Sequence, residues 1–257
     1  MKNSAIAIAA IAALIGTPSF AADMAVKPLP PPAPAWSWTG FYIGGNAGYA
    51  DDRSHFNTTM SSGTFFIPAS LVFIDTTGTG SATGHGFTGG AQAGYNAQLP
   101  NLFVLGMEWD FDYLGGTPSF SAGGLTPGGT TFALTHALKP EWIATVRPRL
   151  GYAFDRTLVY ATGGLAFVGA KYTEVYADSL PLAYNLSSSG DLGWAAGGGV
   201  EYSLNPSWSI RAEYLYAQFG ALNASGACIN ACGGTNILSG GGDLRVQSVR
   251  GGLNYHF

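Results

Sequence analysis

The stretch Leu102-Phe-Val-Leu-Gly-Met-Glu-Trp-Asp-Phe-Asp-Tyr-Leu114 decides the fold of this chain. From Phe103 to Tyr113 every odd position is large and apolar, while the even positions include three acids, Glu108, Asp110 and Asp112. Successive side chains of a β-strand point to opposite faces, whereas a helix would scatter the three acids among the aromatic residues. The stretch therefore predicts a strand with one apolar face and one acidic face.

Three later segments, 142–154, 208–216 and the chain end from 244, alternate in the same way. The charged residues on the faces opposite their apolar residues are Arg147, Arg149, Arg211, Glu213 and Arg250. Weaker versions of the pattern, diluted by glycine and alanine, run over 38–50, 84–99, 157–172 and 191–204. These segments make eight strands in all. In 157–172 both faces are apolar, so the sequence does not decide which face of this strand points outward.

The connections between these strands are alternately very short and long. Three are tight turns of strong turn-forming residues, Pro100-Asn101, Asp155-Arg156 and Asn205-Pro206. The long connections are 51–83, 115–134, 174–190 and 220–243, rich in Gly, Ser and Thr. This alternation is typical of bacterial transmembrane barrels. We therefore expect an all-β fold, an eight-stranded antiparallel up-and-down transmembrane β-barrel with its turns in the periplasm and its loops outside.

The composition agrees with a membrane location. Only 10% of the residues are charged, against about 25% in soluble domains, and 47% are apolar. The one long apolar run free of charge is Ser4 to Phe20, which follows Lys2 and reads as a secretory signal peptide over 1–21. A proline-rich tether is expected over 22–37, and the barrel over 38–257. The net charge of -4 offers no basic surface for nucleic acid.

Alternation places nine charged residues inside the predicted barrel. They are Glu108, Asp110, Asp112, Arg147, Arg149, Glu201, Arg211, Glu213 and Arg250. Eight strands enclose a space just wide enough for side chains, and buried charges must be paired. The sequence therefore favours a lumen plugged by paired charges. The alternative is a lumen in which these charges line an ion path.

Aromatic residues near the strand ends suggest two interfacial girdles. Near the tight turns these are Tyr95, Tyr152, Tyr202 and Tyr255. Near the long connections they are Trp109, Tyr113, Tyr172, Tyr216 and Phe219.

The chain resembles a known family in the motifs at 38–49 (WTGFYIGGNAGY), 89–96 (GGAQAGYN), 162–166 (TGGLA), 211–216 (RAEYLY) and 249–257 (VRGGLNYHF). These are similar to the small outer-membrane proteins of α-proteobacteria, the 25 and 31 kDa outer-membrane protein family, related to the OmpA-like transmembrane barrel. The resemblance implies that Leu253, Tyr255 and Phe257 form the signal read by the barrel-assembly machinery. It implies a structural role in the cell envelope, with passage of small solutes as an alternative, and it brings no catalytic residues.

Other reactive residues suggest weaker hypotheses. Cys228 and Cys232 lie four apart in an exported chain and predict a local disulfide. His55, His85 and His136 are expected in or near outer loops, and His256 lies in the last strand. The three outer histidines suggest a serine-histidine-acid set or a surface haem or metal site, and ordinary solvated loop histidines are the alternative. Asp51, Asp52, Asp178 and Asp243 are expected as loop-end charges, with divalent cations or bridged lipopolysaccharide as the alternative.

The function expected from these observations is a non-enzymatic structural protein that supports the outer membrane, without a cofactor or bound metal. Its expected partners are outer-membrane lipid, lipopolysaccharide and the barrel-assembly machinery. Two alternatives stay open: a narrow porin for small solutes, and a surface module that binds haem or a host ligand through its long loops.

Overall fold

The structure is a computed structural model, and it describes residues 36–61, 66–179, 183–227 and 237–257. The expected signal peptide, most of the expected tether, and both Cys228 and Cys232 lie outside the described residues. The described residues belong to one unit, Trp36–Phe257.

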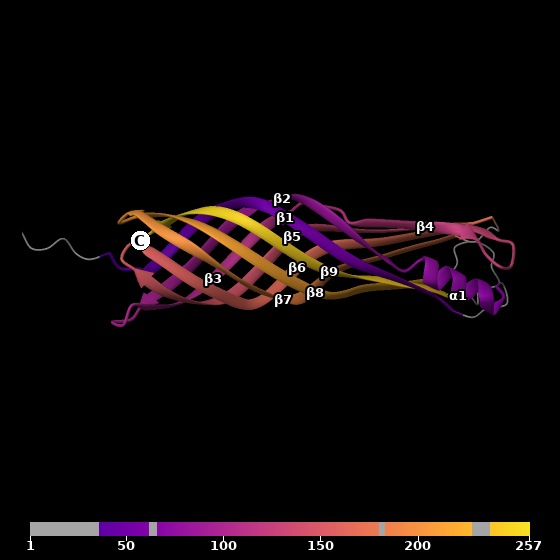
Figure 1. The fold of residues 1–257 in the computed structure, drawn as a ribbon, viewed down its shortest axis with the longest axis horizontal. Coiled ribbons are helices and arrows are strands. Elements are labelled where there is room, and N and C mark those ends of the chain that lie inside the picture. Colours follow the sequence, from indigo (N-terminus) through magenta and orange to yellow (C-terminus); the bar gives the residue numbers. More distant parts are fainter. Residues whose placement is uncertain (1–35, 62–65, 180–182, 228–236) are drawn as a thin grey trace, which may run out of the picture. The chain divides into compact units, whose positions relative to one another are not determined.

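This unit is built from antiparallel strands with one short helix among the described residues. The elements are β1 (Gly40–Met60), α1 (Pro68–Thr77), β2 (Gly80–Gln98), β3 (Phe103–Leu114), β4 (Ser119–Leu125), β5 (Thr131–Phe154), β6 (Thr157–Asp178), β7 (Ala183–Asn205), β8 (Trp208–Ala227) and β9 (Ile237–His256). Neighbouring strands follow the order β3-β2-β1-β9-β8-β7-β6-β5-β4, and a further pairing of β3 with β5 closes the ring (Figure 1). The predicted eight-stranded barrel is confirmed, and β4 is an additional strand that follows β3 along the same edge of β5, further from the tight turns.

The two ends of the barrel differ. At one end, here called the turn end, the strands are joined by the predicted tight turns and the chain reaches Phe257 (Figure 1). In the turn between β5 and β6, Asp155 has a left-handed backbone with φ of 54°, a conformation that Asp tolerates better than most residues. At the opposite end, here called the loop end, lie α1 and β4 (Figure 1).

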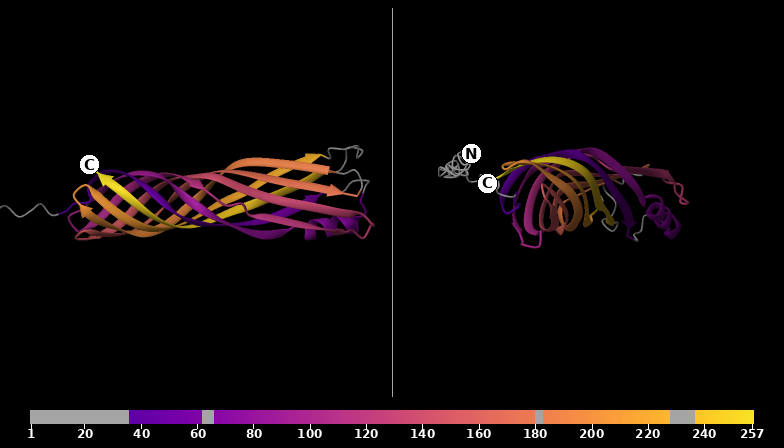
Figure 2. Two further views of the ribbon diagram at one scale, coloured as in Figure 1. Left: turned by 90° about the horizontal axis from the view of Figure 1, so that it is seen from above. Right: turned by 60° about the vertical axis from the view of Figure 1, so that its left-hand side comes forward.

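The strands run much further toward the loop end than the sequence predicts. Five segments that were expected in loops belong to strands: 51–60, 80–83, 131–134, 174–178 and 183–190. The strands β8 and β9 also extend into the expected loop 220–243. Figure 2 shows this long extension of the sheet. The prediction was wrong because most outward side chains of these segments are polar or small, so the segments lack the lipid-facing apolar residues on which it relied. The apolar residues that they point inward include Phe56, Met60, Phe132, Leu134 and Leu238.

Irregularities in the sheet separate the two halves of some strands. The pairing of β5 with β6 shifts between Pro140 and Trp142, and that of β6 with β7 shifts between Val168 and Lys171. In β5 the shift changes which parity faces inward, from Leu138 on one side to Ile143 on the other. A β-bulge has this effect because it adds one residue to one strand of a pair.

The outward face between the two ends is apolar. Phe111 and Leu150 are more than half exposed there, and in β6 the exposed residues are Val159, Leu165 and Phe167, which settles the outer face of that strand. Of the expected girdle residues, Tyr172 and Phe219 are buried inside, so these two assignments were wrong. Tyr172 lies in the strand extension, and Phe219 keeps the inward parity of Arg211 and Glu213.

The interior is filled in layers. Near the turn end, Trp38, Val104, Ala153, Leu158 and Tyr160 form a small apolar cluster. The charged residues follow along the strands, and larger apolar clusters fill the loop end. Within the described residues, no helix is long and apolar enough to cross a membrane.

Candidate functional site: the charged lumen

The nine charged residues singled out by the sequence all point into the barrel. Each is at most 5% exposed. They come from five strands: Glu108, Asp110 and Asp112 from β3, Arg147 and Arg149 from β5, Glu201 from β7, Arg211 and Glu213 from β8, and Arg250 from β9. The strand register sets acids directly opposite bases, as in Glu108 with Arg147 and Glu213 with Arg250.

Arg147 lies at the centre of the charge network. Its Nη2 lies 2.8 Å from Glu108, 2.9 Å from Asp110 and 3.2 Å from Glu213. Glu108 and Asp110 come from the neighbouring strand β3, whereas Glu213 comes from β8, which is not adjacent to β5 in the ring. One guanidinium therefore ties neighbouring and distant walls of the barrel together. Charge-assisted hydrogen bonds of this kind are about twice as strong as neutral ones.

Arg250 and Arg211 also reach across the lumen to β3. Arg250 pairs with Asp110 at 2.6 Å and with Asp112, and its Nη2 lies 2.5 Å from Glu213. Arg211 pairs with Glu108. In the ring, β1 and β2 lie between β9 and β3, and three strands lie between β8 and β3 on either side. These contacts therefore cross the interior rather than line a wall.

A second group of contacts extends the network toward the turn end. Arg149 pairs with Glu201 at 2.5 Å and lies over the ring of Tyr160 at 3.5 Å, within the range of a cation–π contact. Tyr42 Oη donates a 2.6 Å hydrogen bond to Glu108, and Tyr160 Oη donates one of 2.7 Å to Glu213. Arg149 also lies 3.8 Å from Glu108, so the nine residues form one connected set of ion pairs.

Glycines make room for these long side chains. A Cβ at Gly48 would overlap the Val249 carbonyl oxygen and lie 2.7 Å from Cα of Arg250. A Cβ at Gly90 would overlap the Phe111 carbonyl oxygen and lie 2.6 Å from Cα of Asp112. The glycines that weakened the alternation of the predicted strands thus stand beside the bulky charged residues.

One serine, one histidine and one acid meet at the turn end. Ser209 Oγ lies 2.8 Å from His256 Nε2 and donates a 2.5 Å hydrogen bond to Glu201. Glu201 approaches the same imidazole nitrogen, at 3.5 Å. A catalytic triad needs its acid on the other nitrogen of the imidazole, and Ser209 is fully buried. The group therefore lacks the geometry of a hydrolase and instead extends the lumen network.

The outer histidines separate into one buried and two exposed residues. His136 is fully buried, stacks on Phe56 at 5.2 Å, and bonds to Thr58 and to the Tyr172 hydroxyl at 2.9 and 2.8 Å. Its expected surface position was wrong, because 131–138 is part of β5 with Phe132, Leu134, His136 and Leu138 inward. His55 and His85 lie on the outward face instead.

The sequence did not reveal that His136 belongs to a buried polar cluster. Glu174 accepts hydrogen bonds from Thr58 and Tyr172, and its pKa is raised to about 7 by burial. Burial also lowers the pKa of His136. The alternation Phe132, Leu134, Leu138 was the signal for this strand segment, but Glu174 had been assigned to a loop.

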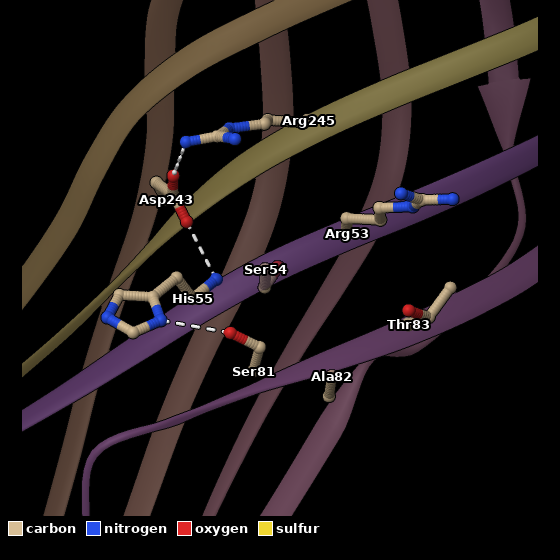
Figure 3. Close-up of a pocket in the computed structure, with 8 residues that line it drawn as sticks. All are labelled: Arg53, Ser54, His55, Ser81, Ala82, Thr83, Asp243 and Arg245. Carbon is tan, nitrogen blue, oxygen red and sulfur yellow. Dashed lines mark hydrogen bonds and ion pairs between the residues drawn. The ribbon is translucent and has the colours of Figure 1, made fainter.

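An outward-facing pocket of about 450 Å³ lies between β1, β2 and β9 toward the loop end. Figure 3 shows its lining residues, Arg53, Ser54, His55, Ser81, Ala82, Thr83, Asp243 and Arg245. His55 donates its backbone N–H to Asp243 at 2.7 Å, and its Nδ1 lies 3.0 Å from Ser81 Oγ. No cluster of three or more metal-ligating side chains occurs among the residues that the structure describes.

The closed ring, the apolar outer face and the inward charges together define a small transmembrane β-barrel. The chain belongs to the outer membrane protein beta-barrel domain family, whose model matches residues 7–257.

Known proteins place this family in the outer membrane. The chain is 38% identical to the 31 kDa outer-membrane immunogenic protein of Brucella melitensis, over 97% of this chain and 98% of that protein. It is 28% identical to the 25 kDa outer-membrane immunogenic protein of Brucella abortus, over 100% of this chain and 99% of that protein. Among solved structures, outer membrane protein OprG of Pseudomonas aeruginosa is 13% identical, with a TM-score of 0.44, over 86% of this chain and 99% of that chain.

Proposed function

We propose that the protein is a structural component of the outer membrane, a barrel whose plugged lumen serves stability rather than transport. In this proposal the turn end faces the periplasm and the loop end lies outside the cell. The observation that carries it is the set of ion pairs from β8 and β9 to β3, because these contacts occupy the middle of the lumen.

The layers on both sides of the network support the same function. Near the turn end, Trp38 is fully buried and lies 5.9 Å from the His256 ring, centre to centre. Toward the loop end, Phe56, Leu138 and Leu244 are fully buried in a continuous apolar cluster. A solute would have to displace two apolar layers and break several buried ion pairs, each costly to separate.

Planar-bilayer recording of the purified full-length protein tests this proposal. We expect no steady single-channel opening under voltages at which a known porin, inserted in the same bilayer, conducts. Folding of the purified barrel is verified independently by its resistance to unfolding in unheated SDS. A steady unit conductance from the wild-type protein would refute the plug and favour the narrow porin.

The proposed orientation has its own test. Cys228 and Cys232 are first replaced by serine. Single cysteines placed at Ser121 in β4 or at Arg156 in the β5–β6 turn are then labelled on intact cells with a membrane-impermeant maleimide. The reagent should label the cysteine at 121 and not the one at 156. The opposite pattern would show that the barrel is inverted.

A further inference from the structure

The two register shifts near Pro140 and Val168 leave a hollow on the outward face of the barrel. Its volume is about 450 Å³. Its lining includes Glu141, Trp142, Lys171 and the serines Ser187, Ser188 and Ser189. The hollow thus combines an aromatic ring, a cation and several hydroxyl groups.

Two lysines meet beside this hollow. Lys139 in β5 and Lys171 in β6 are directly opposite in the register, and both are exposed on the outward face. Like charges directly opposite across a strand pair destabilise a sheet. Within the described residues neither lysine forms an ion pair, and Glu141, although it lines the hollow, is joined to neither.

The hollow lies where the apolar outer face ends. Trp142 is 37% exposed and stacks on Phe111 with ring centres 5.5 Å apart. Its indole lies across Gly169, because a Cβ at that glycine would overlap the indole nitrogen. Tryptophan favours the boundary between hydrocarbon and headgroups, where its ring is buried and its N–H is hydrated. One outward position further toward the loop end stand the two lysines.

A second pair of directly opposite cations differs in one respect. Arg53 and Arg245 face each other across β1 and β9. Each has its own acid, Asp51 at 3.0 Å and Asp243 at 3.2 Å. The protein therefore neutralises the arginine pair itself, whereas the lysine pair has no counter-charge among the residues that the structure describes.

We propose that the anionic headgroup of an outer-leaflet glycolipid, the phosphate of lipopolysaccharide, supplies that counter-charge. Lys139 and Lys171 pair with the phosphate, the hydroxyls of Ser187 to Ser189 line its site, and Trp142 contacts the lipid at the base of the headgroup. The inference rests on the proposed orientation, which places the lysines at the outer leaflet.

The test uses the full-length protein in nanodiscs of zwitterionic phospholipid that contain diphosphorylated lipid A. The number of lipid A molecules retained per barrel is measured by native mass spectrometry as lipid A is titrated. Each basic residue near anionic lipid contributes roughly fivefold in affinity, so K139Q/K171Q should bind about 30-fold more weakly. E141Q should bind more tightly than the wild type, because it removes a repelling carboxylate.

Matched controls define what would overturn the inference. R156Q removes one cation from the turn end, and R53Q/R245Q removes the neutralised pair; both should stay within about twofold of the wild type. Lipid A without phosphates should lose the preference, and millimolar inorganic phosphate should not displace lipid A. Unchanged binding by K139Q/K171Q, or full displacement by inorganic phosphate, would refute the glycolipid site.

The cysteine labelling described above separates the two proposals. If labelling supports the orientation while K139Q/K171Q binds lipid A normally, only the lipid site fails. If labelling shows an inverted barrel, the lysines lie at the inner leaflet, and both the proposed orientation and the lipid site are refuted.

Discussion

At the scale of single residues, alternation along a strand predicts which charged residues point into the lumen but not how they pair. The parity of Phe103 to Tyr113 was enough to place Glu108, Asp110 and Asp112 inside, where the structure has them. Alternation could not show which acid meets which base, because Arg250 and Arg211 reach β3 across the lumen and not along neighbouring strands. Partners of that kind depend on the closed ring.

Removing Arg147 should destabilise the barrel strongly. R147A removes one buried cationic partner from each of Glu108, Asp110 and Glu213 and leaves the network with an excess of negative charge. Breaking a buried ion pair costs about 3–5 kcal/mol. The measurement is equilibrium unfolding in urea from lipid vesicles, followed by the gel shift in unheated SDS. R156A, in an exposed turn, should change stability by no more than about 0.5 kcal/mol. A loss in R147A as small as that in R156A would show that the network contributes little.

Glu174 should make stability fall as the pH rises toward neutrality. Its pKa is raised by burial from 4.5 to about 7, so the folded state holds a proton that the unfolded state has lost between those values. By linkage, stability then decreases with pH across this window. The lowered pKa of His136 acts in the opposite sense, because stability is lost as the pH falls through the ordinary histidine value of 6.5.

The variant E174Q separates these two groups. Glutamine resembles the protonated acid, so the advantage of E174Q over the wild type should be smallest near pH 5 and grow to on the order of 1–3 kcal/mol at pH 8. The urea midpoint is measured from pH 5 to pH 8. E141Q, which changes an exposed glutamate, should run parallel to the wild type. A difference between E174Q and wild type that does not change with pH would contradict the assignment.

At the scale of elements, the sequence predicts a strand well wherever lipid touches it. The tight turns and the eight strands follow from the apolar outer face and from turn-forming residues such as Asp155. Beyond the bilayer both the outer face and the loops are polar, so β1 from 51 to 60 reads like a loop although Phe56 and Met60 point inward. The bulge at Pro140–Trp142 adds to the difficulty, because it breaks the parity of β5.

Glycines within one strand should differ in their tolerance of a methyl group. G48A places a Cβ against the backbone of β9, 2.7 Å from Cα of Arg250, and should cost about 1–3 kcal/mol through overpacking. G45A, three residues earlier, meets nothing closer than 3.6 Å. It should be neutral or stabilising by up to about 1 kcal/mol, because alanine restricts the unfolded chain. Equal unfolding free energies for the two variants would show that the space beside Arg250 is not limiting.

At the scale of the whole molecule, the layers of the interior act in series. The charged layer lies between the cluster at Trp38 and Val104 and the cluster at Phe56, Leu138 and Leu244. Family membership and fold class followed from the sequence, but this layering did not. Beyond the cluster at Phe56, a further apolar cluster, which includes Met60, Phe132, Leu134 and Leu238, is built by strand extensions that were expected to be loops.

Weakening one layer should therefore leave the barrel closed. Neither R147A alone nor F56A alone should conduct ions in planar bilayers. In R147A the apolar layers still block the lumen, and in F56A the charged layer does. Combining R147A with F56A, L244A and W38A should produce transient openings in the same recordings. Steady conduction by R147A alone would show that the apolar layers do not seal the lumen.

The pairing of β1 with β9, in which Tyr42 lies opposite His256, also constrains how the molecule comes to exist. The first strand, β1, cannot complete its pairing until the last strand, β9, has been synthesised, so the ring cannot close while the chain is still emerging. Contacts between such distant segments slow folding, and a β-sheet missing one strand exposes two edges that invite aggregation. We therefore expect the chain to need protection from aggregation between synthesis and insertion, because the seam between β1 and β9 closes only when the last strand is present.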